Sequence, residues 1–174
     1  MCASADFKKR GESKIALDDY YRTNAKKEES HYDFCVRCGW KKYIDQMIAI
    51  DYLILNRDRH GANIEILRNA RARILRIAPL FDHGLSLLYS CISDEAAMKF
   101  DIMEDKRCQN FIGSYSCYEN LNFIKACGDV FEGKLKESDR SIIFEGLETI
   151  LSEVFIDKIW NMIYERYKVY ENLS

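Results

Sequence analysis

The fold of this 174-residue chain is decided by the stretch Asn56-Arg57-Asp58-Arg59-His60-Gly61-Ala62-Asn63, followed by Pro79-Leu80-Phe81-Asp82-His83-Gly84. The stretch contains two of the three histidines and the only proline. Asn63 follows Asp58 by five residues, and Asp82 follows Asn63 by nineteen. A β-hairpin can fill the second gap and bring its two ends together. The spacing therefore predicts one site built at the ends of a hairpin.

The residue types in this stretch suit phosphoryl transfer. The oxygens of a transferred phosphoryl group carry charge that magnesium neutralises, and magnesium takes oxygen ligands. Asp82 offers a carboxylate and Asn63 an amide oxygen, so both are candidate Mg²⁺ ligands. Asp58 is placed to accept the proton of an attacking hydroxyl. The alternative interpretation is structural, because Asp, His and Asn near a turn can also cap a helix or close a hairpin.

The wider pattern resembles a known family. The residues Asp51-Tyr52-Leu53-Ile54-Leu55 precede the Asp-Arg-His-x-x-Asn motif, and Ser86-Leu87 follow the Asp-His-Gly motif. This combination resembles the HipA-like serine/threonine kinases and is similar, more distantly, to the phosphoinositide 3- and 4-kinases. The match is dense over residues 51 to 87, about a fifth of the chain, and weaker from about Phe7 to the C-terminus.

The resemblance implies a fold, a reaction and partners. It implies a mainly α, α+β protein-kinase-like C-terminal lobe, with Asp58 as catalytic base and with Asn63 and Asp82 binding Mg²⁺ and ATP. The implied reaction transfers phosphate from ATP to a serine or threonine of a protein substrate. Some members of the family are toxins of toxin–antitoxin pairs, so an antitoxin-like partner is expected.

Some parts of a complete kinase are not found in this sequence. Such an enzyme also uses a Gly-rich loop and a strand lysine over the phosphates, but the chain has no G-x-G-x-x-G motif. Only Gly11 and Gly39 precede Asp58. We therefore expect residues 1–38 to form an arm or interlobe remnant, and residues 39–174 to form the helical lobe of a single-domain chain. An N-lobe is an expected partner, and an inactive kinase-fold remnant that acts as a binding module is the alternative.

A phosphoinositide-kinase-like activity is a second alternative within the enzymes. Lipid kinases meet inositol phosphates with basic residues in the segment after the Asp-x-Gly motif. Here residues 85–97 contain no Lys or Arg and carry Asp94 and Glu95 instead. This composition favours a protein substrate.

The composition is that of an ordinary globular protein. Hydrophobic residues make up 48% and charged residues 31% of the chain, and the net charge is −2. This balance predicts no general attraction to nucleic acid, and no apolar run is long enough for a membrane span. Seven cysteines, of which Cys35 and Cys38 form the one C-x-x-C pair, favour free thiols in a reducing cytoplasm.

Hydrophobic periodicity predicts the main elements. Apolar residues recur at steps of three and four from Gly39 to Leu55, which predicts a buried helix. Asp51 lies in that helix, either buried against Arg57, Arg59 or His60, or exposed. Residues 63–67 and 73–77 alternate as two strands of a hairpin. Further helices are expected near residues 93, 118–127, 138–151 and 152–170.

The two histidines beside the candidate ligands are expected to differ in role. His60 lies two residues after the proposed base, in the turn that must hold Asp58 and Asn63 around a reacting phosphate. A histidine there can bridge a carboxylate to the backbone or meet a phosphate oxygen. His60 is therefore a candidate catalytic residue, whereas His83 is expected to be a structural hydrogen-bonding group.

Overall fold

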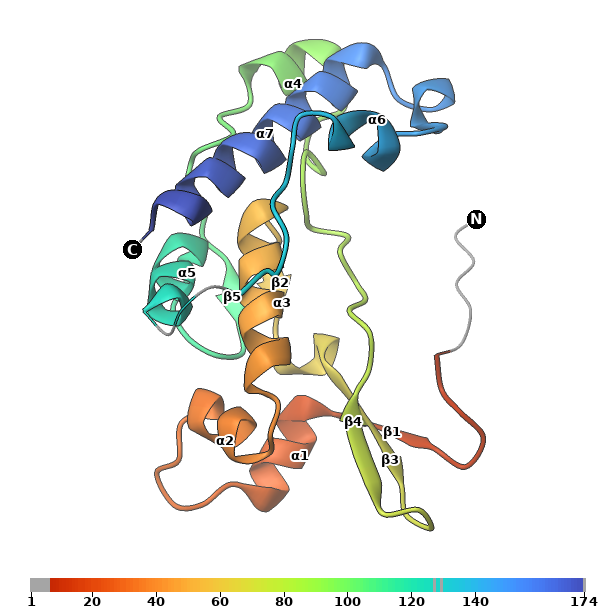
Figure 1. Ribbon diagram of the computed structural model, residues 1–174, viewed down its shortest axis with the longest axis vertical. Helices are drawn as coiled ribbons and strands as arrows, with labels where there is room; N and C mark the ends of the chain where they lie inside the picture. The colour runs from red at the N-terminus through yellow and green to blue at the C-terminus, as the bar shows by residue number, and fades with distance from the viewer. Residues whose placement is uncertain (1–6, 127, 129, 174) are drawn as a thin grey trace.

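A computed structural model describes residues 7–126, 128 and 130–173. The described chain contains seven α-helices, two 3-10 turns and five short strands (Figure 1). The helices are α1 (Leu17–Asn24), α2 (His31–Arg37), α3 (Lys41–Leu53), α4 (Asp94–Lys99), α5 (Cys117–Lys125), α6 (Asp139–Ile143) and α7 (Glu153–Asn172). The strands are β1 (Ser13–Ala16), β2 (Asp58–Arg59), β3 (Glu65–Asn69), β4 (Ile74–Ile77) and β5 (Gln109–Asn110), and the 3-10 turns are η1 (Gly61–Asn63) and η2 (Leu147–Thr149). The predicted mainly helical lobe with a small β-hairpin is confirmed.

Helix α3 is the central element of the molecule (Figure 1). It contacts α2, α5 and α7, and Ile44, Met47 and Ile48 are fully buried along it. This burial on several sides is expected of an apolar helix that lies inside the fold. The periodicity from Gly39 to Leu55 predicted this helix to within two residues at each end.

A three-stranded antiparallel sheet lies at one end of α3. Its strand order is β1-β3-β4, so β3 is the central strand. The predicted hairpin is confirmed, although β3 begins and ends two residues later than its alternation suggested. Strand β1 was not predicted, and it pairs with β3 with Ile15 opposite Ile66. The Leu17 amide then donates to the Ile64 carbonyl at 2.8 Å, which ties the start of α1 to the sheet.

One main core and one smaller core stabilise the fold. The main core surrounds α3 and includes Leu17, Phe34 and Cys35 from the first 38 residues. The smaller core joins α4 to α7 through Ala97, Phe144 and Trp160, among others. The chain between β4 and α4, yellow-green in Figure 1, runs from the sheet to this second core. The segment with the Asp-His-Gly motif therefore connects the two ends of the molecule.

The segment from residue 138 to 151 differs from the single helix that its apolar residues predicted. Helix α6 ends at Ile143, and η2 begins only after Gly146, which has a φ of 79°. A positive φ breaks a right-handed helix and suits glycine. As a result Ile142 and Ile150 are exposed, at 72% and 78%.

Helix α7 begins at Glu153, one residue after the start that its apolar spacing predicted. The Ser152 hydroxyl accepts the Phe155 amide, as an N-cap serine does. The buried Arg166 of α7 donates to the Tyr52 carbonyl at 3.1 Å and so ties α7 to the end of α3.

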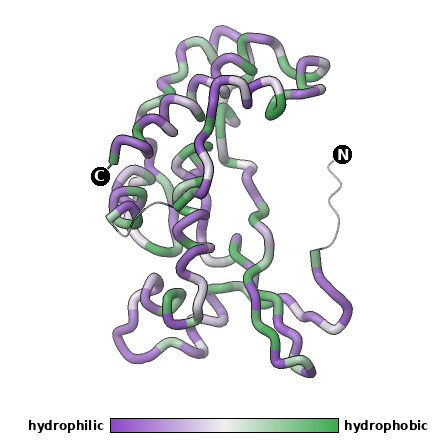
Figure 2. Tube along the Cα trace, viewed as in Figure 1, coloured by the Kyte–Doolittle hydropathy of each residue, from purple (hydrophilic) through white to green (hydrophobic). Residues whose placement is uncertain are grey.

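Hydrophilic and hydrophobic residues alternate along the helices (Figure 2). Within the part of the chain that the structure describes, no helix is long and apolar enough to cross a bilayer.

Candidate active site

The loop after α3 is held in place by Asp51 and Asn56. Asp51 is 1% exposed, so the buried one of its two expected positions is correct. Its carboxylate accepts the Asn56 side-chain amide at 2.9 Å, and its carbonyl accepts the Asn56 backbone amide at 2.8 Å. The side-chain oxygen of Asn56 then accepts the Asp58 amide at 3.3 Å. These bonds fix the path of the chain from the helix into Asp58.

Arg59 is the hub of the site. Its side chain is fully buried and forms a bidentate ion pair with Asp51, with nitrogen–oxygen distances of 2.9 and 3.0 Å. Of the three partners that the sequence allowed for Asp51, the structure shows Arg59. A buried charge needs such a partner, since an unpaired one would be strongly destabilising.

The same guanidinium joins the two motifs. One nitrogen, Nη1, donates to the Asn63 carbonyl at 3.2 Å and to the Phe81 carbonyl at 2.8 Å. The other, Nη2, lies 3.1 Å from Nδ1 of His83. Arginine has no acceptor, so His83 must accept through Nδ1. Both residues that flank Asp82 therefore bind Arg59, which brings the Asp-His-Gly segment to the loop that carries Asn63.

The two candidate metal ligands differ in how they are held. Asn63 is buried, and its side-chain nitrogen donates to the Asp58 carbonyl at 3.0 Å, which leaves its oxygen as the atom able to bind a cation. Asp82 is exposed and has a φ of 55°. Such a φ is uncommon for a residue with a side chain, and strain of this kind is concentrated at functional sites.

The oxygen atoms of Asn63 and Asp82 fit magnesium in the form in which proteins bind it together with a nucleotide. Among the described residues no group of three or more His, Cys, Asp or Glu could hold a metal. One carboxylate from Asp82 and one amide oxygen from Asn63 match the few protein ligands that Mg²⁺ takes when phosphates and waters supply the others.

His60 lies next to the proposed base. Its Nε2 is 3.6 Å from an oxygen of Asp58, and its Nδ1 accepts the Ala62 amide at 3.2 Å as the N-cap of η1. The Asp58 and His60 side chains are each one-third exposed, so both are accessible from solvent. His83 meets Arg59 instead. Partial burial, and then the charge of Arg59, lower the pKa of His83 below its ordinary value.

Three features of the site went beyond the sequence motifs. Strand β2 pairs in parallel with β5, and the Gln109 amide donates to the Arg57 carbonyl at 2.8 Å. The Arg57 amide donates to the Leu85 carbonyl at 3.2 Å, so the segment after Gly84 is fixed to the loop that carries Asp58. The buried Ser86 hydroxyl nearby has no hydrogen-bond partner among the residues that the structure describes. The backbone partners of these groups are distant in sequence, and no local pattern signals them.

Comparison with known proteins supports the fold. The chain is similar to the crystal structure of the Helicobacter pylori proinflammatory kinase CtkA, with a TM-score of 0.62 and 22% sequence identity. The likeness covers 95% of this chain and 72% of that chain. No protein-family model and no curated protein matches the sequence. The chain therefore has a kinase-like fold.

Proposed function

We propose that the chain is the catalytic C-lobe of a HipA-like, ATP- and magnesium-dependent protein serine/threonine kinase. The observation that carries this proposal is the bridge made by Arg59, whose Nη1 binds the carbonyls of both Asn63 and Phe81. The bridge holds the loop of the base and the segment of the acidic ligand together, as in-line phosphoryl transfer needs. The kinase-like fold supports the same proposal.

Each site residue has a role in the proposed reaction. The oxygen of a serine or threonine hydroxyl bonds to the γ-phosphorus of ATP, and the Asp58 carboxylate accepts the proton of that hydroxyl. The bond from that phosphorus to the bridging oxygen breaks, and ADP leaves with the electron pair. Asn63 and Asp82 would hold Mg²⁺, which supplies positive charge to the phosphate oxygens. His60, 3.6 Å from Asp58, keeps the base oriented.

The proposal includes a second lobe as partner. The phosphate lid and the lysine that kinases use have no counterpart among the motifs of this sequence. An N-lobe, in the same or another polypeptide, would supply them, and an antitoxin-like protein would control the assembled enzyme. A protein substrate is favoured over a phosphoinositide because residues 85–97, next to the site, contain no Lys or Arg.

Phosphate transfer tests the proposal. The chain, joined to its N-lobe, would be incubated with radiolabelled ATP, Mg²⁺ and either a mixed protein substrate or phosphoinositide vesicles. We expect label on protein serine or threonine, and its loss in Asp58→Asn and Asp82→Asn, with unchanged labelling in the surface variant Glu145→Gln. Labelling that survives Asp58→Asn would refute the assigned base. Labelled lipid in place of protein would support the phosphoinositide alternative, and no labelling by the wild-type assembly would support the inactive remnant.

A further inference from the structure

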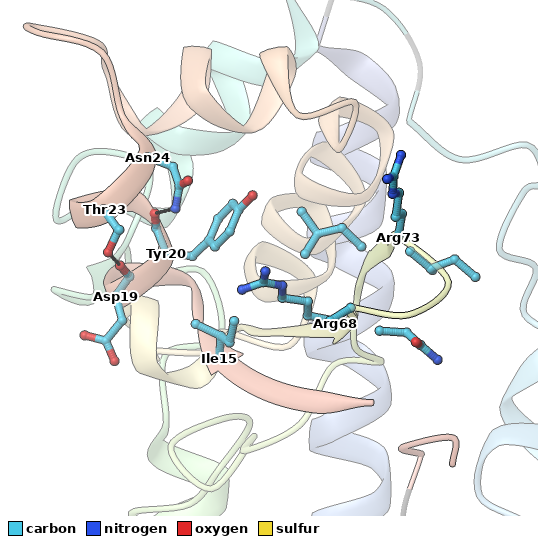
Figure 3. A pocket seen from close by; sticks show the side chains of 11 residues that line it. Ile15, Asp19, Tyr20, Thr23, Asn24, Arg68 and Arg73 are labelled. Carbon is cyan, nitrogen blue, oxygen red and sulfur yellow. Dashed lines mark hydrogen bonds between the residues drawn. The ribbon is translucent and has the colours of Figure 1, made fainter. Parts of the chain in front are cut away.

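A hollow on the surface lies between the sheet and α1, away from the motifs described above (Figure 3). Its volume is about 560 Å³. One wall is the sheet, in which Arg68 pairs with Ser13 on one side and with Leu75 on the other. Because side chains of a strand alternate between faces, Ile15 lies on the same face as Arg68 and Leu75. The opposite wall is α1.

The hollow combines an apolar floor with polar edges. Tyr20 of α1 and Leu75 of β4 pack against the main core and line the hollow. On the rim, the Asn24 side-chain nitrogen donates to the Tyr20 carbonyl at 2.8 Å, which leaves its oxygen free to accept. Asn69 lines the hollow at the hairpin end. Apolar side chains with a few polar groups around them are typical of a binding site.

The charged groups that line the hollow are two arginines and one aspartate. Arg68 and Arg73 are exposed, and neither guanidinium forms an ion pair with any residue that the structure describes. In Figure 3 the Arg68 side chain extends toward Tyr20, whereas the Asp19 carboxylate points away from it. Asp19 is already paired with Arg22, at 3.5 Å. The hollow is therefore locally positive on a chain whose net charge is −2.

We propose that this hollow is a docking site for an acidic, extended peptide segment of a partner protein. Acidic side chains would meet the two guanidinium groups, which suit carboxylates through paired hydrogen bonds. Alternate apolar side chains of the segment would contact Tyr20 and Leu75. Nucleic acid is a poorer fit, because two arginines on an acidic chain neutralise few phosphates.

None of the residues that line the hollow belongs to the motifs of the candidate active site, and the two arginines lie toward the far end of the hairpin. The five residues of β3 lie between Asn63 and the hairpin end, a distance of roughly 17 Å at about 3.3 Å per residue. A partner held in the hollow would leave Asp58 and Asp82 open. The inference does not require phosphoryl transfer, and its test measures binding alone, so its failure would leave the proposed function standing.

Fluorescence anisotropy with the full chain tests the docking site. The probe is a labelled short peptide in which glutamates alternate with leucines, compared with the same peptide carrying glutamine in place of glutamate. We expect the acidic peptide to bind more tightly, and binding to weaken as salt is raised. Arg68→Gln and Arg73→Gln should each weaken it by about two- to fivefold, the scale of an exposed charge pair.

Arg71→Gln is the matched control. Arg71 is exposed on the turn between Arg68 and Arg73 but does not line the hollow, so the charge change is the same at almost the same place. We expect this variant to bind nearly as the wild type does. Equal loss in Arg71→Gln would contradict the docking site in favour of general attraction to the hairpin. Equal affinity for the two peptides would also overturn the docking site. So would tighter binding of single-stranded DNA than of the acidic peptide, if Arg68→Gln weakens the DNA binding.

Discussion

Arg59 and Asp51 decide the geometry of the site at the scale of single residues. Both are almost fully buried, at 0% and 1% side-chain exposure, and each satisfies the charge of the other. The pair is the part of the site that the motif alone could not define. Its charges are almost completely shielded from solvent, so breaking the pair should destabilise the fold strongly.

Asp51→Ala is expected to destabilise the fold by about 3–5 kcal/mol, because it leaves the Arg59 charge buried without a partner. Urea unfolding measures this, with Glu145→Ala as the exposed control. The double variant Asp51→Leu/Arg59→Met removes both charges and should recover part of the loss. A double variant no more stable than Asp51→Ala would show that packing, and not the unpaired charge, sets the cost.

His60→Ala is expected to lower turnover of the assembled kinase by about tenfold to a thousandfold, the scale of a positioned supporting group. The reason is its place 3.6 Å from Asp58. His83→Phe should be milder, since His83 meets Arg59, which has other partners. Steady-state phosphorylation measures both, with thermal melting as the control. Matching melting temperatures together with a larger loss in His83→Phe would reverse these roles.

At the scale of elements, α1 and η1 are fitted closely against each other. A Cβ added to Gly61 in η1 would lie 2.6 Å from the Phe111 ring and would also meet the Asp18 carboxylate of α1. A Cβ at this position would require its neighbours to shift, and the buried Phe111 ring has little room to do so. The turn that carries Asn63 is therefore held from outside by α1.

Gly61→Ala is expected to destabilise the fold by about 1–3 kcal/mol, the cost of overpacking. Gly133→Ala is the matched control, because a Cβ there meets nothing within 4 Å. Chemical unfolding of the two variants gives the comparison. Equal stability of the two would mean that α1 moves aside at no cost, and that it does not brace the loop.

At the scale of the whole molecule, the sequence predicted the elements whose pattern is local and long. Helix α3, the hairpin and α7 all carry clear periodicity or a cap residue. Strand β1 was missed because it has four residues, two of them exposed, and a partner about fifty residues away. The break between α6 and η2 depends on Gly146, whose positive φ outweighs the apolar spacing around it.

The candidate site was predictable as a set of residues but not as a geometry. Asp58, Asn63 and Asp82 follow from their spacing, whereas the sequence offered three partners for Asp51 and no way to choose. The pairing of Asp51 with Arg59 depends on the path of the chain after the hairpin, because Arg59 also donates to the Phe81 carbonyl there. Contacts of this kind depend on the tertiary fold, and propensity does not determine them.

In the proposed function, Asn63 and Asp82 together hold a metal–nucleotide complex. Binding of Mn²⁺·ATP to the chain joined to its N-lobe tests this, with Mn²⁺ in place of Mg²⁺ and water-proton relaxation as the readout. The wild type should bind, and Asp82→Asn should lower the affinity by at least about tenfold, while Glu145→Gln leaves it unchanged. Failure of the wild type to bind, or equal affinity of wild type and Asp82→Asn, would contradict the claim.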